Sequence, residues 1–159
     1  MKVSSRAHYG LRAMTELAKA FGGGPLALSE IARVEGLPAT YLEQLMAELR
    51  KAGLVEGLRG LHGGYTLTRR PSQITVGEVV RILEGPIAPV DCTAEDYAAG
   101  SCHREPDCLS RSVWQRVKES IDAVLDATTL QDLVDGREGS RTVLPTLPIS
   151  IQKVGCYSR

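Results

Sequence analysis

The feature that most constrains the fold is a pair of helical patterns, joined by a very short turn, within residues 28–52. Apolar residues at helical spacing predict a short helix over 30–35, with Ser29 as its N-cap and Gly36 after its end. Beyond a three-residue turn, a longer helix is expected over 39–52. Its apolar stripe consists of Leu42, Leu45, Met46 and Leu49. A short helix, a glycine-containing turn and a longer helix are typical of a helix-turn-helix unit.

The segments on either side complete a small head. Before the pair, apolar residues from Tyr9 to Phe21 predict a first helix, which Ser4 or Ser5 can cap. After the pair, 54–55 and 65–67 are expected to be short strands around a glycine-rich loop. The loop and strands predict a β-hairpin wing.

The second half of the chain has a different pattern. A helix capped by Thr75 is expected to end at Gly85, and residues 86–108 then lack a helical period. An amphipathic helix follows over 110–128, about 28 Å long, which a partner subunit would have to cover. Residues 129–134 can add one helical turn.

We therefore expect a mainly α protein: a winged helix-turn-helix head with a β-hairpin wing, and a long dimerisation helix. The head is expected to span 1–85, a cysteine-bearing loop 86–109, the dimerisation helix with its following turn 110–134, and a flexible tail 135–159.

Composition limits the class of protein. With 159 residues, 43% of them hydrophobic and 24% charged, the chain fits one soluble domain and is too short for a barrel enzyme. It has no apolar run of the roughly 18 to 20 residues that a membrane span needs, so we expect a cytoplasmic protein without a membrane partner. The net charge is zero, but residues 1–85 carry 11 Lys and Arg against 8 Asp and Glu. A basic head suits double-stranded DNA.

Four side chains near the start of the expected helix over 39–52 are the candidates for DNA contact. Gln44 can read adenine and Glu43 can accept from cytosine, while Thr40 and Tyr41 can reach phosphate or a thymine methyl. On the wing, Arg59 beside Gly60 can enter a minor groove or pair with phosphate. The first helix offers Lys2, Arg6 and Arg12 as phosphate contacts. The alternative is that these are ordinary solvated surface residues.

Three of the four cysteines, Cys92, Cys102 and Cys108, lie within the irregular segment. In a reducing compartment such a set indicates metal binding or redox chemistry. The paired knuckles of zinc sites and ferredoxins are absent, but widely spaced thiolates can hold an iron-sulfur cluster if a fourth ligand comes from elsewhere. The candidates for that ligand are His8, Asp91, His103 and Asp107; Arg111 is excluded because guanidinium keeps its proton. Free buried thiols, a thiol-disulfide switch and zinc remain alternatives, and Cys156 is expected to be incidental.

Three stretches resemble the IscR-type winged-helix regulators: LPATYLEQLMAELRKAGLVEGLRGLHGGY at 37–65, ITVGEVVRILEG at 74–85 and CLSRSVWQRV at 108–117. The resemblance implies a cytoplasmic homodimer that binds operator DNA, acts as a repressor or activator, and controls genes of iron-sulfur cluster biogenesis. It also implies a cluster on Cys92, Cys102 and Cys108, with [2Fe-2S] favoured over [4Fe-4S]. In the iron-sulfur assembly regulator a histidine follows the last cysteine by three residues, where this chain has Arg111. In the nitric-oxide-sensing relatives a first-helix residue of the partner subunit takes that role, at the place of His8.

Two other classes of protein remain to be considered. A metal-free thiol regulator of the same fold, or one that docks a partner protein through the cysteine loop, would bind DNA without iron. An enzyme is not expected, because the chain has no nucleophile motif, phosphate-binding glycine loop or paired-carboxylate site.

Overall fold

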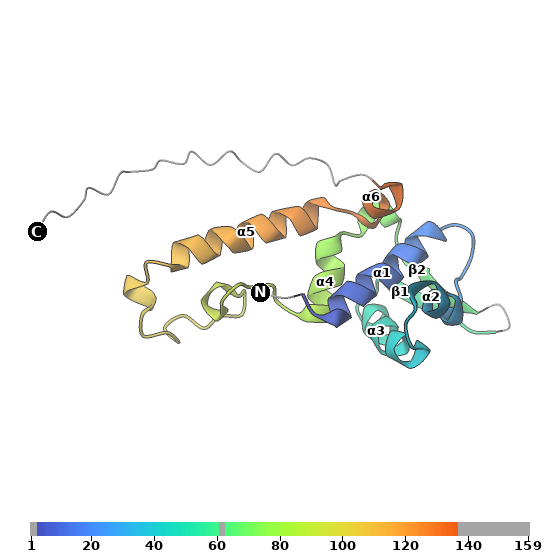
Figure 1. The fold of residues 1–159 in the computed structure, drawn as a ribbon, viewed down its shortest axis with the longest axis horizontal. Helices are drawn as coiled ribbons and strands as arrows, with labels where there is room; N and C mark the ends of the chain where they lie inside the picture. The colour runs from blue at the N-terminus through green and yellow to red at the C-terminus, as the bar shows by residue number, and fades with distance from the viewer. Residues whose placement is uncertain (1–2, 61–62, 137–159) are drawn as a thin grey trace, which may run out of the picture.

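The computed structural model describes residues 3–60 and 63–136. Within these residues the chain forms six α-helices and one two-stranded antiparallel sheet, which confirms the mainly α class with a hairpin (Figure 1). The elements are α1 Ser5–Lys19, α2 Leu28–Glu35, α3 Ala39–Lys51, β1 Val55–Leu58, β2 Gly64–Leu67, α4 Val76–Glu84, α5 Arg111–Ala127 and α6 Leu130–Asp135. Lys2 and Cys156 lie outside the described residues, as does nearly all of the expected tail.

The beginnings of α1 and α2 have different causes. The Ser4 hydroxyl accepts a hydrogen bond from the Ala7 amide, as expected for a cap of α1. The prediction that Ser29 caps the second helix is wrong, because α2 begins at Leu28 after Ala27. The backbone of Leu26 is bonded in both directions to Tyr65 at 2.9 Å. This link to the hairpin fixes an extended residue shortly before the helix, so the helix begins earlier than its cap signal suggests.

The core of the head lies between α1, α2, α3, α4 and the hairpin. All four residues of the expected stripe on α3 are buried, as are Met14 and Leu17 of α1 and Ile31 of α2. The hairpin pairs Val55 with Leu67 and Leu58 with Gly64, so both strands are longer than predicted. Burial of one face of each helix leaves the opposite face of α3 in solvent.

Helix α4 is packed closely between neighbours. Thr75 and Glu78 form a reciprocal capping box at its start, which confirms the cap predicted at Thr75. A Cβ added to Gly10 of α1 would lie 2.1 Å from Leu83 Cδ1, so glycine allows α1 and α4 to approach closely. Helix α4 is therefore one of the elements through which the head contacts the rest of the chain, together with α1, which packs on α6.

The segment after α4 runs outward and then returns as α5 (Figure 1). Residues 85–110 lack α-helix, as predicted, but contain short 3-10 turns at Asp91–Thr93 and Glu105–Asp107. Helix α5 agrees with the predicted 110–128, and α6 inserts Leu130 into the core of the head. In the part of the chain that is described, no helix has the length and apolar character needed to span a membrane.

Candidate nucleic-acid interface and cysteine loop

The solvent face of α3 carries the predicted DNA-reading residues. Thr40, Glu43 and Gln44 are exposed near the helix start, on the side opposite the buried stripe. The first turn holds no acidic residue, so no carboxylate offsets the positive end of the helix dipole there. This end of α3 is suited to approach a phosphate backbone and a base edge together.

Tyr41 differs from its three neighbours because its ring is half-buried. It packs edge-to-face on Tyr9 of α1, with ring centroids 6.2 Å apart and an interplanar angle of 85°. The ring therefore stabilises the contact between α1 and α3, and a phosphate contact through its hydroxyl stays a prediction.

The wing places a second cation beside Arg59. Arg59 is exposed in the hairpin loop next to Gly60, whose φ of 122° is a conformation that favours glycine. A cavity of about 200 Å³ at the base of the wing is lined by both Arg59 and Arg50 of α3. No sequence signal marks Arg50, since it is far along the helix from Gln44 and only the folding back of the hairpin brings it near Arg59.

Two cations of α1 are engaged inside the head. Arg6 Nη2 lies 2.5 Å from the Glu48 carboxylate of α3, and Arg12 is paired with Glu35 of α2. These pairs tie α1 to both helices of the helix-turn-helix unit. Phosphate contact by either arginine would compete with these pairs.

The three loop cysteines are free and half-buried. Cys92 lines a cavity of about 350 Å³ together with Tyr97, Arg111 and Lys118. The Cys102 amide donates to the Tyr97 hydroxyl at 3.1 Å, and Cys108 Sγ lies 3.5 Å from Ser110 Oγ. Among the described residues, no three or more His, Cys, Asp or Glu side chains come together as a metal site.

Glu105 organises the turn between these cysteines. Its carboxylate accepts from the Gly100 amide at 2.7 Å, the Arg111 guanidinium at 2.6 Å and the Tyr97 hydroxyl at 3.0 Å. These hydrogen bonds, that from Gly100 foremost, lower the pKa of Glu105. Arg111 also lies over the Tyr97 ring. Arg111, which stands where the iron-sulfur assembly regulator has a histidine ligand, is thus part of a network that stabilises the loop.

The environment of Cys108 favours its thiolate. Hydrogen bonding to the side chain and backbone of Ser110 lowers the pKa of Cys108, and nearby Arg104 contributes electrostatically. The thiolate is the form that binds metal or reacts with oxidants.

His8 lies away from the cysteine loop's network, on the exposed side of α1. It lines a largely apolar cavity of about 470 Å³ formed by α1, α4, residues 86–89 and α5. A groove of about 610 Å³ along α5 adjoins this cavity, because Ile121 and Leu125 line both. The described structure therefore leaves a continuous apolar surface from α5 to His8.

Comparison with known proteins identifies the class. The Rrf2 family model, described as an iron-dependent transcriptional regulator, matches residues 3–136. The chain belongs to the Rrf2 family of transcriptional regulators.

Several relatives of this Rrf2 protein are well covered by the match. CymR of Bacillus subtilis, an HTH-type transcriptional regulator, is 43% identical over 141 residues, which are 89% of this chain and 95% of CymR. Its structure, described as that of the global cysteine regulator of this organism, matches with a TM-score of 0.71 over 86% of this chain and 98% of that one. The structure of T. potens IscR matches at 45% identity and a TM-score of 0.68, over 86% of this chain and 88% of that one. This Rrf2 chain is thus a DNA-binding regulator and not an enzyme.

Proposed function

We propose that this Rrf2 protein binds operator DNA as a homodimer and that an iron-sulfur cluster on Cys92, Cys102 and Cys108 controls that binding. The observation that carries the proposal is the placement of three free, half-buried thiols on one loop between the head and α5. The genes of iron-sulfur cluster biogenesis are the proposed targets, following the resemblance to IscR-type regulators.

The homodimer is proposed from the surface of α5. None of its residues is buried, and Val113, Trp114, Val117 and Val124 are exposed on its outer side. A soluble monomer rarely exposes so continuous an apolar surface. The occupant we propose is a second copy of α5, because a twofold arrangement would place the same groove against itself and give two heads for two half-sites.

The donor set fits an iron-sulfur cluster by its chemistry, since thiolates are the usual protein ligands. It does not fit as the loop is arranged, because the described residues do not gather three such ligands. Binding therefore requires residues of 92–108 to move closer together, and His8 of the partner subunit is the proposed fourth ligand. A [2Fe-2S] cluster is proposed ahead of [4Fe-4S]. When bound, the cluster would supply redox and ligand-exchange chemistry. A change in the cluster would alter how the cysteine loop packs, and the chain's own residues would pass that change to the DNA-binding head.

The test is isolation without oxygen, followed by iron and acid-labile sulfide analysis, visible absorption and electron paramagnetic resonance of the reduced protein. We expect stoichiometric iron and sulfide in the wild type and loss of both in Cys92→Ser, Cys102→Ser and Cys108→Ser. Cys156→Ser is the matched control and is expected to keep them. Wild-type protein that stays free of iron after reconstitution would refute the proposal.

A metal-free thiol regulator is the second candidate, and the lowered pKa of Cys108 favours it. The likeness to CymR supports the same alternative. It predicts a disulfide between loop cysteines after peroxide treatment, seen by peptide mass spectrometry, and operator binding that changes with it in iron-free protein. If the loop instead docks a partner protein, operator binding would be unchanged both by cluster reconstitution and by peroxide treatment.

A further inference from the structure

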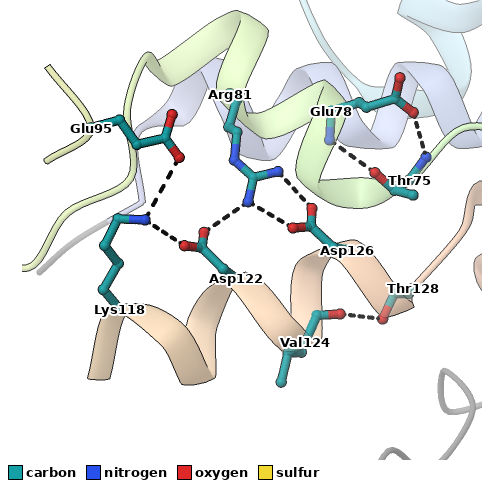
Figure 2. A network of polar contacts seen from close by, with 9 residues as sticks. All are labelled: Thr75, Glu78, Arg81, Glu95, Lys118, Asp122, Val124, Asp126 and Thr128. Carbon is teal, nitrogen blue, oxygen red and sulfur yellow. Dashed lines mark hydrogen bonds and ion pairs between the residues drawn. The ribbon is translucent and has the colours of Figure 1, made fainter. Parts of the chain in front are cut away.

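Helix α5 is joined to the head by a row of ion pairs (Figure 2). Arg81 of α4 lies 2.6 Å from Asp126 and 2.8 Å from Asp122, both on α5. Lys118, one turn before Asp122 on α5, lies 2.6 Å from the other carboxylate oxygen of Asp122 and 3.7 Å from Glu95 of the cysteine loop. The charges alternate in sign along the row. We call this set of five residues the α4–α5 ion-pair chain.

The inner end of this ion-pair chain is fixed by backbone hydrogen bonds. The Val76 amide donates to the Thr128 carbonyl at 2.8 Å, and the Leu130 amide donates to the Ile74 carbonyl at 3.0 Å. These bonds join the start of α4 to the end of α5. Lys118 lies ten residues before Thr128, about 15 Å along the helix axis. Beyond this junction, α4 and α5 are joined by the ion pairs and by Leu125, which packs against Val76 and Val80.

Gly77 gives a second, steric indication that this approach is specific. A Cβ built on Gly77 would lie 2.0 Å from Asp126 Oδ1 and 2.7 Å from Arg81 Nη1. Gly77 is buried in the first turn of α4, two residues after the Thr75 cap. The space that its missing side chain leaves is occupied by the Arg81–Asp126 pair.

The pairs differ in shielding along the row. The Lys118 side chain is 11% exposed and that of Asp122 is 20% exposed, whereas that of Glu95 is 69% exposed. The central pairs, which share Asp122, are thus partly desolvated and are screened less by salt, whereas Asp126 at the inner end is 49% exposed. The link to Glu95 is long and exposed. It is therefore the weakest pair of the row and the one that a movement of the loop breaks most easily.

We propose that the α4–α5 ion-pair chain relays the position of the cysteine loop to α4 and so sets the angle between α5 and the DNA-binding head. Arg81 is the positioning residue, since it alone of the five belongs to the head. Glu95 is the input, three residues after Cys92, and α4 passes the change to α1 through the Gly10 contact. The relay to DNA rests on the proposed homodimer, because the angle matters only when two heads must match two half-sites.

The first test needs neither iron nor DNA. Glu95→Lys reverses the charge facing Lys118, and exchange of the Val76 and Leu130 amide hydrogens, followed by NMR, reports the α4–α5 junction. In the otherwise wild-type protein, we expect Glu95→Lys to speed exchange of these two amide hydrogens by about fivefold or more. A factor of about five is the lower end of the coupling that is usual between two sites in a protein. In an Arg81→Gln background we expect the added effect to stay within about twofold, the limit for independent sites. Equal effects in both backgrounds would overturn the proposal.

Two variants separate positioning from general loss of structure. Gly77→Ala keeps every charge and favours helix, but displaces Asp126, so it is expected to uncouple Glu95→Lys as Arg81→Gln does. Arg69→Gln removes an ion pair to Glu78 of α4 that does not reach α5, and is expected to leave the coupling intact. Uncoupling by Arg69→Gln, or none by Gly77→Ala, would contradict the relay.

The second test uses a duplex that the wild-type protein selects from a random-sequence pool. We expect Arg81→Gln to reduce, by about fivefold or more, the preference for that duplex over one with its half-sites one base pair further apart. Binding to an isolated half-site should change by less than about twofold, and Arg81→Lys should restore part of the preference. Unchanged spacing preference refutes the relay to DNA. Failure of wild type to select any duplex refutes the proposed function instead, while amide exchange still decides the ion-pair chain.

Discussion

At the scale of single residues, we propose that Gln44 of α3 reads one base of the operator. It is exposed on the face of α3 opposite the core, so its truncation removes no packing. We expect Gln44→Ala to weaken binding to the selected duplex by about 1 to 3 kcal/mol and to relax the choice of one base. Fluorescence anisotropy with the four bases at each position checks this. Gln73→Ala, an exposed glutamine of the head outside α3, is the control. Equal losses in both variants would argue against base reading by Gln44.

Glu105 gives a pH-dependent prediction within the cysteine loop. Its pKa is lowered from the ordinary 4.5, so the charged form is the one that the folded loop stabilises. A depressed pKa means that this stabilisation is present above about pH 4.5 and is lost as pH falls through the folded value. We expect Glu105→Gln to speed exchange of the Gly100 amide hydrogen several-fold at neutral pH, and acid to do the same in wild type after correction for intrinsic rates.

Asp107→Asn is the control for Glu105, because it changes a carboxylate of the same 3-10 turn that does not accept the Gly100 amide. NMR exchange measurements on the three proteins compare them directly. If Gly100 exchanges at the same rate in Glu105→Gln and wild type, the carboxylate does not hold the loop as described.

At the scale of elements, helix caps give a stability prediction that contrasts two residues. Thr75 completes a capping box on α4, whereas Ser29 lies inside the first turn of α2, which has no side-chain cap. We expect Thr75→Ala to lower the free energy of unfolding by about 0.5 to 2 kcal/mol, and Thr75→Ser to lose less. Ser29→Ala should stay within about 0.5 kcal/mol. Urea denaturation followed by circular dichroism measures all three, and a larger loss for Ser29→Ala would contradict the observed start of α2.

The same contrast explains what sequence could predict at this scale. The stripe of α3, the cap at Thr75 and the extent of α5 follow from spacings of three and four residues, which depend only on helix geometry. The start of α2 depends instead on a backbone link to Tyr65, 39 positions away. Arg81 and Asp122 are 41 positions apart, so their pairing follows from the packing of α4 on α5. Local periodicity carries no information on such pairs.

The candidate site divides in the same way. The exposure of Thr40, Glu43 and Gln44 follows from the period of α3. The many polar side chains of the cysteine loop agree with its three thiols being only half-buried. The role of Arg50 and the network around Glu105 needed the folded hairpin and loop. The ligand set Cys92, Cys102, Cys108 and His8 stays a prediction, since only a rearranged loop and a second subunit would bring these residues together.

At the scale of the whole molecule, the apolar face of α5 predicts the assembly. Val124 is 55% exposed, on the groove side of the helix and away from the core of the head. A glutamate there would place a charge in the proposed interface, where desolvation is costly. We expect Val124→Glu to raise the dimer dissociation constant by at least about tenfold, or 1.4 kcal/mol, in sedimentation equilibrium. The separated monomer should still unfold in a cooperative thermal transition, because the head keeps the core formed by α1–α4.

Ala123→Glu is the matched control, since it adds the same charge one residue earlier, at an exposed position that does not line the groove. We expect it to remain a dimer and to bind the selected duplex as wild type does. Val124→Glu should bind that duplex with the affinity of a single head for one half-site, because the gain from two linked heads depends on their being held together. If Val124→Glu sediments as a dimer, another surface joins the subunits, and the angle between α5 and the head would no longer set the spacing of the two recognition helices.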